Sequence, residues 1–182
     1  MIGQIAYLAL LFLELIFFAG IAIYTVFLIY SSIKGASYVP TKNKEIDLIL
    51  KLAQLKKNQI FLDLGCGDGR MVRRAVKQYH VKGIGIDVNF ILLIWAKLLA
   101  KIQKLNAIEF RLTDMASNHL PLTDVIYIFL FPKLIEKITP QLKEKLDKGS
   151  LIISHGFKIT KFNSFLKKKI DHHPFPTYYY KL

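Results

Sequence analysis

Three glycines and two aspartates gather in the stretch "DLGCGDG", residues 63–69, which follows the apolar residues 60–62. Glycine allows a sharp turn in which backbone amides approach a ligand closely. The carboxylates of Asp63 and Asp68 would repel a pyrophosphate. The spacing is G-x-G-x-G, not the G-x-G-x-x-G of dinucleotide-binding loops, and Arg70 stands where the third glycine would be. The chemistry that fits this stretch is the binding of a ligand with a cationic end.

Short apolar runs alternate with helical patterns along the chain, and this alternation positions the glycine turn. It predicts parallel strands joined by crossover helices, and the unbroken apolar run 125–131 is typical of a strand covered on both faces. The turn then lies at the carboxyl edge of the sheet, where open parallel sheets bind ligands. The expected strands are 59–64, 83–87, 107–113, 125–131 and 150–155, with last strands around Ile170 and at 177–182; the expected helices are 44–56, 70–79, 90–105 and 133–146.

Acidic residues are expected at the ends of three successive strands, as Asp63, Asp87 and Asp114. Any one of them alone would be read as a helix N-cap or a turn carboxylate. Together with the glycine turn, they indicate a binding site at this edge of the sheet.

The stretch "DLGCGDG" resembles motif I of the class I S-adenosylmethionine-dependent methyltransferases, whose cofactor is a nucleoside with an amino-acid tail and a sulfonium charge. The resemblance implies an α/β fold, with a Rossmann-like seven-stranded methyltransferase sheet flanked by helices, and S-adenosyl-L-methionine as the cofactor. It places Asp63 near the amino-acid end, Asp87 on the ribose hydroxyls and Asp114 on the adenine amino group. The implied cofactor-binding residues are Tyr38, Asp63, Gly65, Cys66, Gly67, Asp68, Gly69, Asp87, Val88, Asn89, Thr113, Asp114 and Met115.

A narrower resemblance extends over about residues 36–157. The segments "YVPT", "DLGCGDGR", "GIDVN", "FLFP" and "SHGF" follow one another as in the membrane-anchored protein-lysine methyltransferases of the ATP synthase c subunit and the adenine nucleotide translocase, and in their prokaryotic relatives. The family's "ELN" is "DVN" here, and little aligns after Phe157. The resemblance implies a lysine side chain of a membrane protein as the methyl acceptor.

The end of the fourth expected strand bears on the acceptor. Many nucleic-acid and glutamine methyltransferases carry N-P-P-Y or D-P-P-Y there, whereas this chain has Leu130, Phe131 and Pro132. A lysine needs no polar clamp, but it must lose a proton, and an apolar entrance would lower its pKa. Candidate catalytic residues are therefore Tyr38, Phe131, Pro132 and His155. Core packing of Phe131, anchoring of the linker by Tyr38 and a structural role for His155 remain open alternatives. No metal site is expected, because His172 and His173 are adjacent and are interpreted as solvated.

The amino-terminal region is apolar from Ile5 to Ile33 apart from Glu14 and a few hydroxyl-bearing residues. At ~1.5 Å per residue, a helix of this length exceeds the ~30 Å hydrocarbon core of a bilayer. We interpret it as a retained, single-pass transmembrane helix. No Lys or Arg precedes it and several lysines follow it, so the remaining domain is expected on the cytoplasmic side.

The net charge is +13, and residues 1–33 contribute only Glu14. We interpret the basic domain as a partner of an anionic bilayer; nucleic acid is not expected, since no arginine-rich arm or nucleic-acid module accompanies the charge. The helix expected after Asn89 has an apolar end, which is either buried under the linker or placed in the membrane interface. In the second case Phe90, Leu93 and Trp95 would enter the interface while lysines reach the head groups, and we favour this interpretation.

These observations predict three segments: a transmembrane anchor at 1–34, a linker with the "YVPT" motif at 35–43 and a methyltransferase domain at 44–182. The predicted function is a membrane-anchored S-adenosylmethionine-dependent protein-lysine N-methyltransferase. Alternatives are a membrane lipid N-methyltransferase, an RNA methyltransferase and a non-catalytic module that binds the cofactor.

Overall fold

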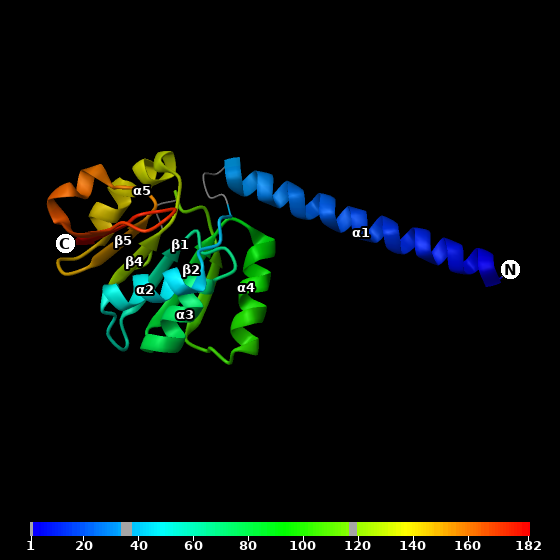
Figure 1. Ribbon diagram of the computed structural model, residues 1–182, viewed down its shortest axis with the longest axis horizontal. Coiled ribbons are helices and arrows are strands. Elements are labelled where there is room, and N and C mark those ends of the chain that lie inside the picture. The colour runs from blue at the N-terminus through cyan, green and yellow to red at the C-terminus, as the bar shows by residue number, and fades with distance from the viewer. Residues whose placement is uncertain (1, 34–37, 117–119) are drawn as a thin grey trace.

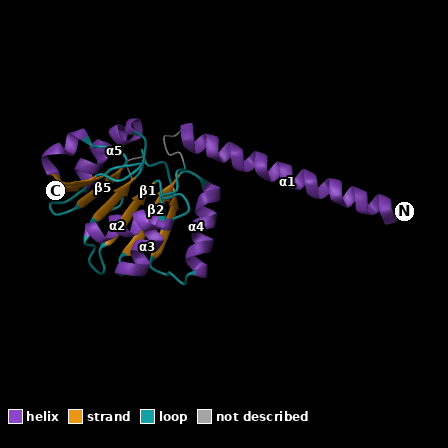
Figure 2. Cartoon of the chain, in the orientation of Figure 1, coloured by secondary structure: helices purple, strands orange, loops and turns teal. Residues whose placement is uncertain are grey.

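The computed structural model of the chain describes residues 2–33, 38–116 and 120–182. A long helix, α1 (Ile2–Ile33), projects from an α/β body that contains all the strands (Figure 1). Figure 2 shows the strands as a single layer with helices on its two sides. This arrangement is the one that the alternation of apolar runs and helical patterns predicts.

The sheet has seven strands in the order β3-β2-β1-β4-β5-β7-β6. The first five strands are parallel, and β7 pairs antiparallel with both β5 and β6. The expected Rossmann-like seven-stranded methyltransferase sheet is confirmed. The strands are β1 (Ile60–Leu64), β2 (Lys82–Asp87), β3 (Ile108–Leu112), β4 (Val125–Ile128), β5 (Leu151–His155), β6 (Leu166–Ile170) and β7 (Thr177–Lys181).

Helices cover both faces because alternate strand residues point to opposite sides. Helices α2 (Asn43–Ala53) and α3 (Arg70–Tyr79) pack with Phe61 and Tyr127 in one core. Helix α5 (Pro132–Lys145) and the 3₁₀ helix η1 (Thr160–Phe165) pack with Leu62 and Leu64 in the other. Helix α4 (Phe90–Ile102) lies against β2 and β3, at the end of the sheet nearest α1 (Figure 1).

Element boundaries differ from expectation at a few points. β4 ends at Ile128 and not at Phe131, because Pro132, whose ring fixes φ and which lacks an N–H, begins α5. Helices α2 and α4 each end three residues earlier than expected, and η1 was not predicted. These differences leave the topology unchanged.

Helix α1 contains a stretch, Gly3–Tyr30, of 28 residues with mean hydropathy 2.4 and no burial inside the protein. It is long and apolar enough to cross a membrane, although length and composition are all that support this, and a signal sequence has the same properties. Residues 35–37 of the expected linker lie outside the described residues. The division into anchor, linker and domain stays a prediction.

Candidate active site

The glycine turn joins β1 to α3 at the carboxyl edge of the sheet, as expected. Gly65, Gly67 and Gly69 have φ values of 78°, 54° and 73°, a region that residues with a Cβ rarely adopt. Space also requires glycine, since a Cβ at Gly67 would lie 2.9 Å from a ring carbon of Tyr38. The turn is fixed to β2, whose Ile86 carbonyl accepts from the N–H groups of Gly65 and Cys66 at 2.9 and 3.0 Å. A ligand can therefore lie directly against this backbone.

Asp87 ends β2 and ties the turn to the start of α4. Its carboxylate accepts from the backbone N–H groups of Gly67 and Asn89, both at 2.8 Å. Asn89 in turn caps α4 by accepting from the Leu92 N–H at 3.1 Å. Burial raises the pKa of Asp87, while these N–H donors oppose the rise. The carboxylate lines the pocket above the turn and keeps lone pairs for a ligand's hydroxyl groups.

Asp63 is the most electrostatically perturbed carboxylate in the pocket. It is buried, and desolvation together with the charges of Asp87 and Asp68 raises its pKa well above the ordinary value. The same burial raises the pKa of the Cys66 thiol. A cationic group bound beside Asp63 would relieve this repulsion. The acidic groups of the pocket therefore favour a ligand with a cationic end, as in the amino group and the sulfonium of S-adenosylmethionine.

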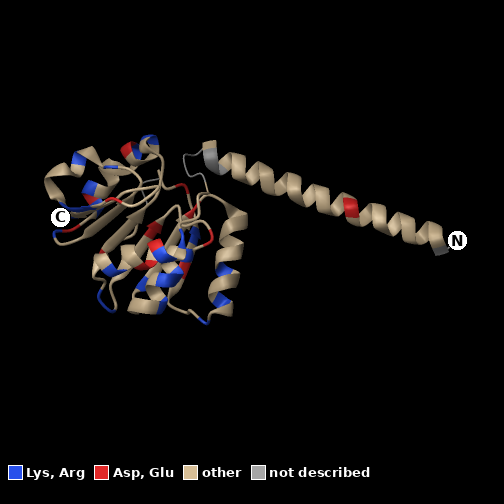
Figure 3. Ribbon diagram, in the orientation of Figure 1, with Lys and Arg blue, Asp and Glu red and all other residues tan. Residues whose placement is uncertain are grey.

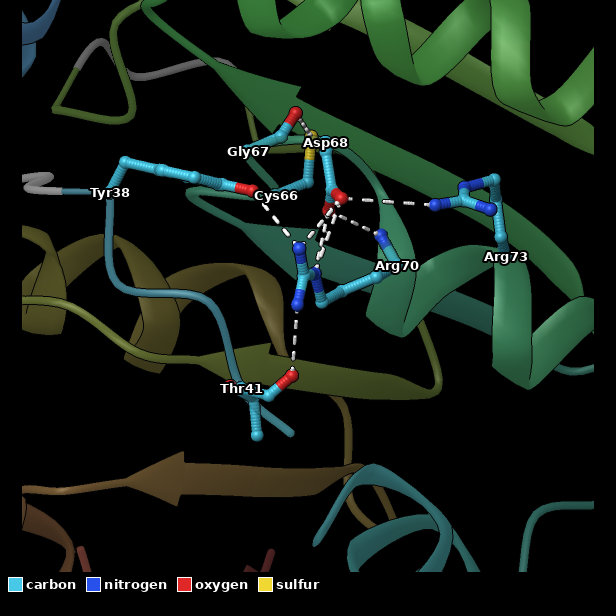
Figure 4. Close-up of polar contacts among 7 residues, drawn as sticks. All are labelled: Tyr38, Thr41, Cys66, Gly67, Asp68, Arg70 and Arg73. Atoms are coloured by element: carbon cyan, nitrogen blue, oxygen red, sulfur yellow. Dashed lines mark hydrogen bonds and ion pairs between the residues drawn. The ribbon is translucent and has the colours of Figure 1, made fainter. Parts of the chain in front are cut away.

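Arg70 organises the opposite wall of the pocket, a role that the sequence did not reveal (Figure 4). Its guanidinium donates to both carboxylate oxygens of Asp68, with Nη2 3.0 Å from Oδ2, and Arg73 adds a contact of 3.9 Å. Nη2 also donates to the Tyr38 hydroxyl at 3.1 Å, and Nη1 to the Thr41 carbonyl at 3.2 Å. Arg70 therefore holds residues 38–41 over the glycine turn. Its place in the "DLGCGDGR" segment was the available signal.

Aromatic and aliphatic side chains from the end of β4 form the remainder of the pocket. Tyr127, Phe129 and Leu130 line it, and the Tyr127 hydroxyl lies 3.5 Å from that of Thr41. Phe131 is 44% exposed and lines a neighbouring apolar hollow with Val39, Phe129, Leu130 and Phe157. Pro132 is exposed at the first turn of α5. Phe129, which was not singled out from the sequence, lines both spaces.

The pocket has about 510 Å³ of space not filled by atoms, part of it open to solvent. Other expected cofactor residues follow the ends of β2 and β3 along the chain; residues 117–119 fall outside the described residues. Thr113 donates its N–H to the Asp87 carbonyl at 3.1 Å, and Asp114 accepts from the Ala116 N–H at 3.0 Å. The cofactor-binding roles of these residues, and of the expected residues that line the pocket, stay predictions.

His155 lies behind the pocket, fully buried at the end of β5. Its ring centroid is 4.6 Å from that of Phe129, and its Nδ1 is 2.8 Å from the Thr177 hydroxyl. Burial, with a contribution from His172, lowers its pKa to about 4, so the ring is neutral at pH 7. Contact with the pocket runs through Phe129 and Tyr127.

Glu45, His155 and His172 place possible metal-ligand atoms within 4.8 Å of one another. His172 is half-buried and bonded to the Thr177 hydroxyl at 2.9 Å, unlike the solvated residue expected. The Thr177 hydroxyl lies within hydrogen-bond distance of His172 Nε2 and of His155 Nδ1, whereas His155 Nε2 and Glu45 Oε1, 3.7 Å apart, are buried and have no hydrogen-bond partner among the described residues.

Comparisons with known proteins agree with this geometry. The family described as "ANTKMT methyltransferase domain" matches residues 63–165. The chain belongs to this family. A curated protein-lysine N-methyltransferase of Saccharolobus islandicus is 31% identical over 138 residues, which cover 73% of this chain and 84% of the relative. The chain is therefore an S-adenosylmethionine-dependent methyltransferase.

Solved structures show the same fold. An RNA methyltransferase from Salinibacter ruber, in complex with S-adenosyl-L-homocysteine, has a TM-score of 0.73 at 29% identity, covering 79% of this chain and 93% of that chain. A methyltransferase from Thiobacillus denitrificans, also with S-adenosyl-L-homocysteine, has a TM-score of 0.59 at 20% identity, covering 64% of this chain and 49% of that chain. The cofactor of this family member is S-adenosylmethionine.

Proposed function

We propose that this methyltransferase transfers methyl groups to lysine side chains of a membrane protein. The observation that carries the proposal is the apolar, aromatic wall formed by Phe129, Leu130 and Phe131 where nucleobase and glutamine methyltransferases place a polar clamp. The name of the Saccharolobus relative, a protein-lysine N-methyltransferase, supports the same acceptor class.

Methyl transfer to lysine requires mainly that the enzyme position the cofactor and the acceptor. When bound, S-adenosylmethionine supplies a methyl group on a positively charged sulfur. Asp63 and Asp87 bind its polar groups, and the glycine turn allows close approach of the backbone. An entering lysine, with an ordinary pKa of about 10.4, must lose its proton to attack. Walls such as Phe129 and Leu130 disfavour the ammonium form and exclude water, and Tyr38 presents an aromatic face to the acceptor's stem. This role of Tyr38 and catalytic participation of Phe131, Pro132 and His155 remain proposals.

Helix α1 is the basis of the proposed membrane association. We propose that it crosses the bilayer once, with the α/β body on the cytoplasmic side, because Lys42, Lys44 and Lys51 follow it and no Lys or Arg precedes it. Figure 3 shows the basic residues gathered on the body, whereas α1 carries none. A tethered enzyme meets membrane-bound acceptors at raised effective concentration. An anionic bilayer is then the surface that the basic body faces.

RNA is the second candidate acceptor. The Salinibacter structure carries the name RNA methyltransferase and is 29% identical to this chain, and the chain is strongly basic. An N-terminal helix of transmembrane length and the apolar wall at residues 129–131 favour a membrane protein over RNA.

The deciding experiment incubates the full-length enzyme with tritiated methyl donor and native membranes from a strain lacking its gene. Label is expected in protein, resistant to nuclease and to lipid extraction, and in methyl-lysine after hydrolysis. Asp87→Asn should abolish the labelling, while Asp171→Asn, which changes an exposed carboxylate, should preserve it. Label that disappears on nuclease treatment would establish RNA instead, and label extracted with lipids would establish a lipid methyltransferase.

A further inference from the structure

Helix α4 exposes a broad apolar surface. Five large side chains on its outer side are between 44% and 66% exposed: Phe90, Ile94, Trp95, Leu98 and Ile102. Leu92, Leu93, Ala96 and Ala100 occupy the opposite side and pack against the body. Leu93, expected at the membrane interface, is thus buried, with 3% of its surface exposed. We call the five exposed residues the α4 outer face.

Exposed lysines lie beside the α4 outer face. Lys97 and Lys101 are exposed one turn apart on α4, and the exposed Lys104 follows its end. At 100° per residue, Lys97 and Lys101 lie about 20° to either side of Phe90, along one border of the α4 outer face. A wide apolar face bordered by lysines is the pattern of helices that lie in the interface of an anionic bilayer. It is also unusual for a helix that faces only water.

The position of α4 relative to α1 agrees with that pattern. The Asn89 side-chain amide, at the start of α4, donates to the Phe27 carbonyl of α1 at 3.3 Å. Figure 1 shows α1 leaving the body on the side covered by α4, and α4 running across the direction of α1. If α1 crosses a bilayer, the plane of that bilayer is therefore roughly parallel to the axis of α4.

We propose that the α4 outer face lies in the head-group region of the same anionic bilayer that α1 crosses. This inference rests on the proposal that α1 spans the membrane. The apolar side chains enter the upper acyl region and the lysines contact lipid phosphates. Asn89 starts α4 and lies beside Asp87 and the glycine turn. The arrangement consequently holds the active site at the membrane surface, where it selects acceptor lysines close to the head groups over those far from the membrane.

Trp95 is the single tryptophan of the chain, so its fluorescence reports on this face alone. The test places the full-length protein in vesicles of phosphatidylcholine and phosphatidylglycerol. A nitroxide near the lipid head group should lower the Trp95 emission to below about half, and aqueous iodide should quench it weakly, since an interfacial helix sits ~5–10 Å deep. Quenching by iodide without quenching by the nitroxide would overturn the proposal. Protection from both would also overturn it, and would indicate that a second copy or another protein covers the face.

A pair of variants tests the contribution of α4 to membrane association independently of α1. Ile94→Glu combined with Leu98→Glu places two charges on the α4 outer face, and Leu48→Glu places one on the exposed side of α2. The double variant should lose most nitroxide quenching and most activity on membrane-held acceptors, yet bind S-adenosylhomocysteine as before; Leu48→Glu should change none of these. Resistance to carbonate extraction tests insertion of α1 separately. Extractable protein would refute the membrane-spanning proposal, whereas inserted protein with an unquenched Trp95 would refute only the role of α4.

Discussion

Gly67→Ala tests whether the position of the Tyr38 ring depends on the glycine turn. The backbone of Gly67 has φ of 54°, and an L-residue in that region costs roughly 1–2 kcal/mol. The new Cβ would also lie 2.9 and 3.0 Å from two ring carbons of Tyr38. The ring must move, which stretches its 3.1 Å hydrogen bond from Arg70.

Gly149→Ala separates these two effects. Gly149 has φ of 96°, and a Cβ there meets nothing within 4 Å. It therefore carries backbone strain without displacing a neighbour. Each kilocalorie lowers the melting temperature of a chain of this size by about 2–4 °C, so both variants should melt several degrees below the parent protein.

Ligand affinity should distinguish the two variants. Displacement of Tyr38 from the pocket wall is worth about 1–2 kcal/mol, because a hydrogen bond to a charged group is affected. Calorimetric titration with S-adenosylhomocysteine should therefore show about tenfold weaker binding for Gly67→Ala and unchanged binding for Gly149→Ala. Equal affinity in both variants would refute the coupling between Tyr38 and the turn.

Three further predictions follow from named groups. Because burial and neighbouring acids raise the pKa of Asp63, Asp63→Asn should raise the melting temperature of the ligand-free protein while weakening S-adenosylhomocysteine binding in calorimetry; lower stability with intact binding would contradict this. The pKa of His155 is about 4 in the folded protein and about 6.5 when unfolded, so its neutral form contributes about 3 kcal/mol of stability above pH 6.5. That contribution is lost as pH falls from 6.5 to 4, and chemical denaturation of His155→Gln should show a flatter pH dependence than that of the exposed-site control His173→Gln. Asp47→Asn removes an exposed pair with Arg74 and should cost less than about 1 kcal/mol in the same denaturation assay.

Much of the fold could be predicted because secondary structure depends mainly on nearby residues. The glycine turn, the alternating apolar runs and the proline at 132 each determine the conformation of the segment that contains them. Strands and helices were therefore placed to within about three residues. β4 shows the limit: an apolar run continues through Phe131, but the strand stops at Ile128, since hydrophobicity alone does not show where strand pairing ends.

The candidate site was predictable where residue type or a recognisable motif marks a position, as at the glycine turn, Tyr38 and Asp87. The residue types and spacing within one segment indicated Asp63, Gly65 and Gly67. Phe129 was missed because an apolar residue in an apolar run gives no sign that it faces a pocket. Leu93 was placed on the wrong side of its helix, because helical periodicity alone does not identify which sector packs against the sheet.

The sequence by itself determined the class of fold, the glycine turn after β1 and the apolar amino-terminal helix, since these depend on residue type and short-range spacing. Tertiary structure alone decided that Arg70 contacts Tyr38 and Thr41, and that His155 Nε2 lies 3.7 Å from a carboxylate oxygen of Glu45. These contacts join residues about 30 and 110 positions apart, and such contacts form only when the packed sheet brings distant segments together.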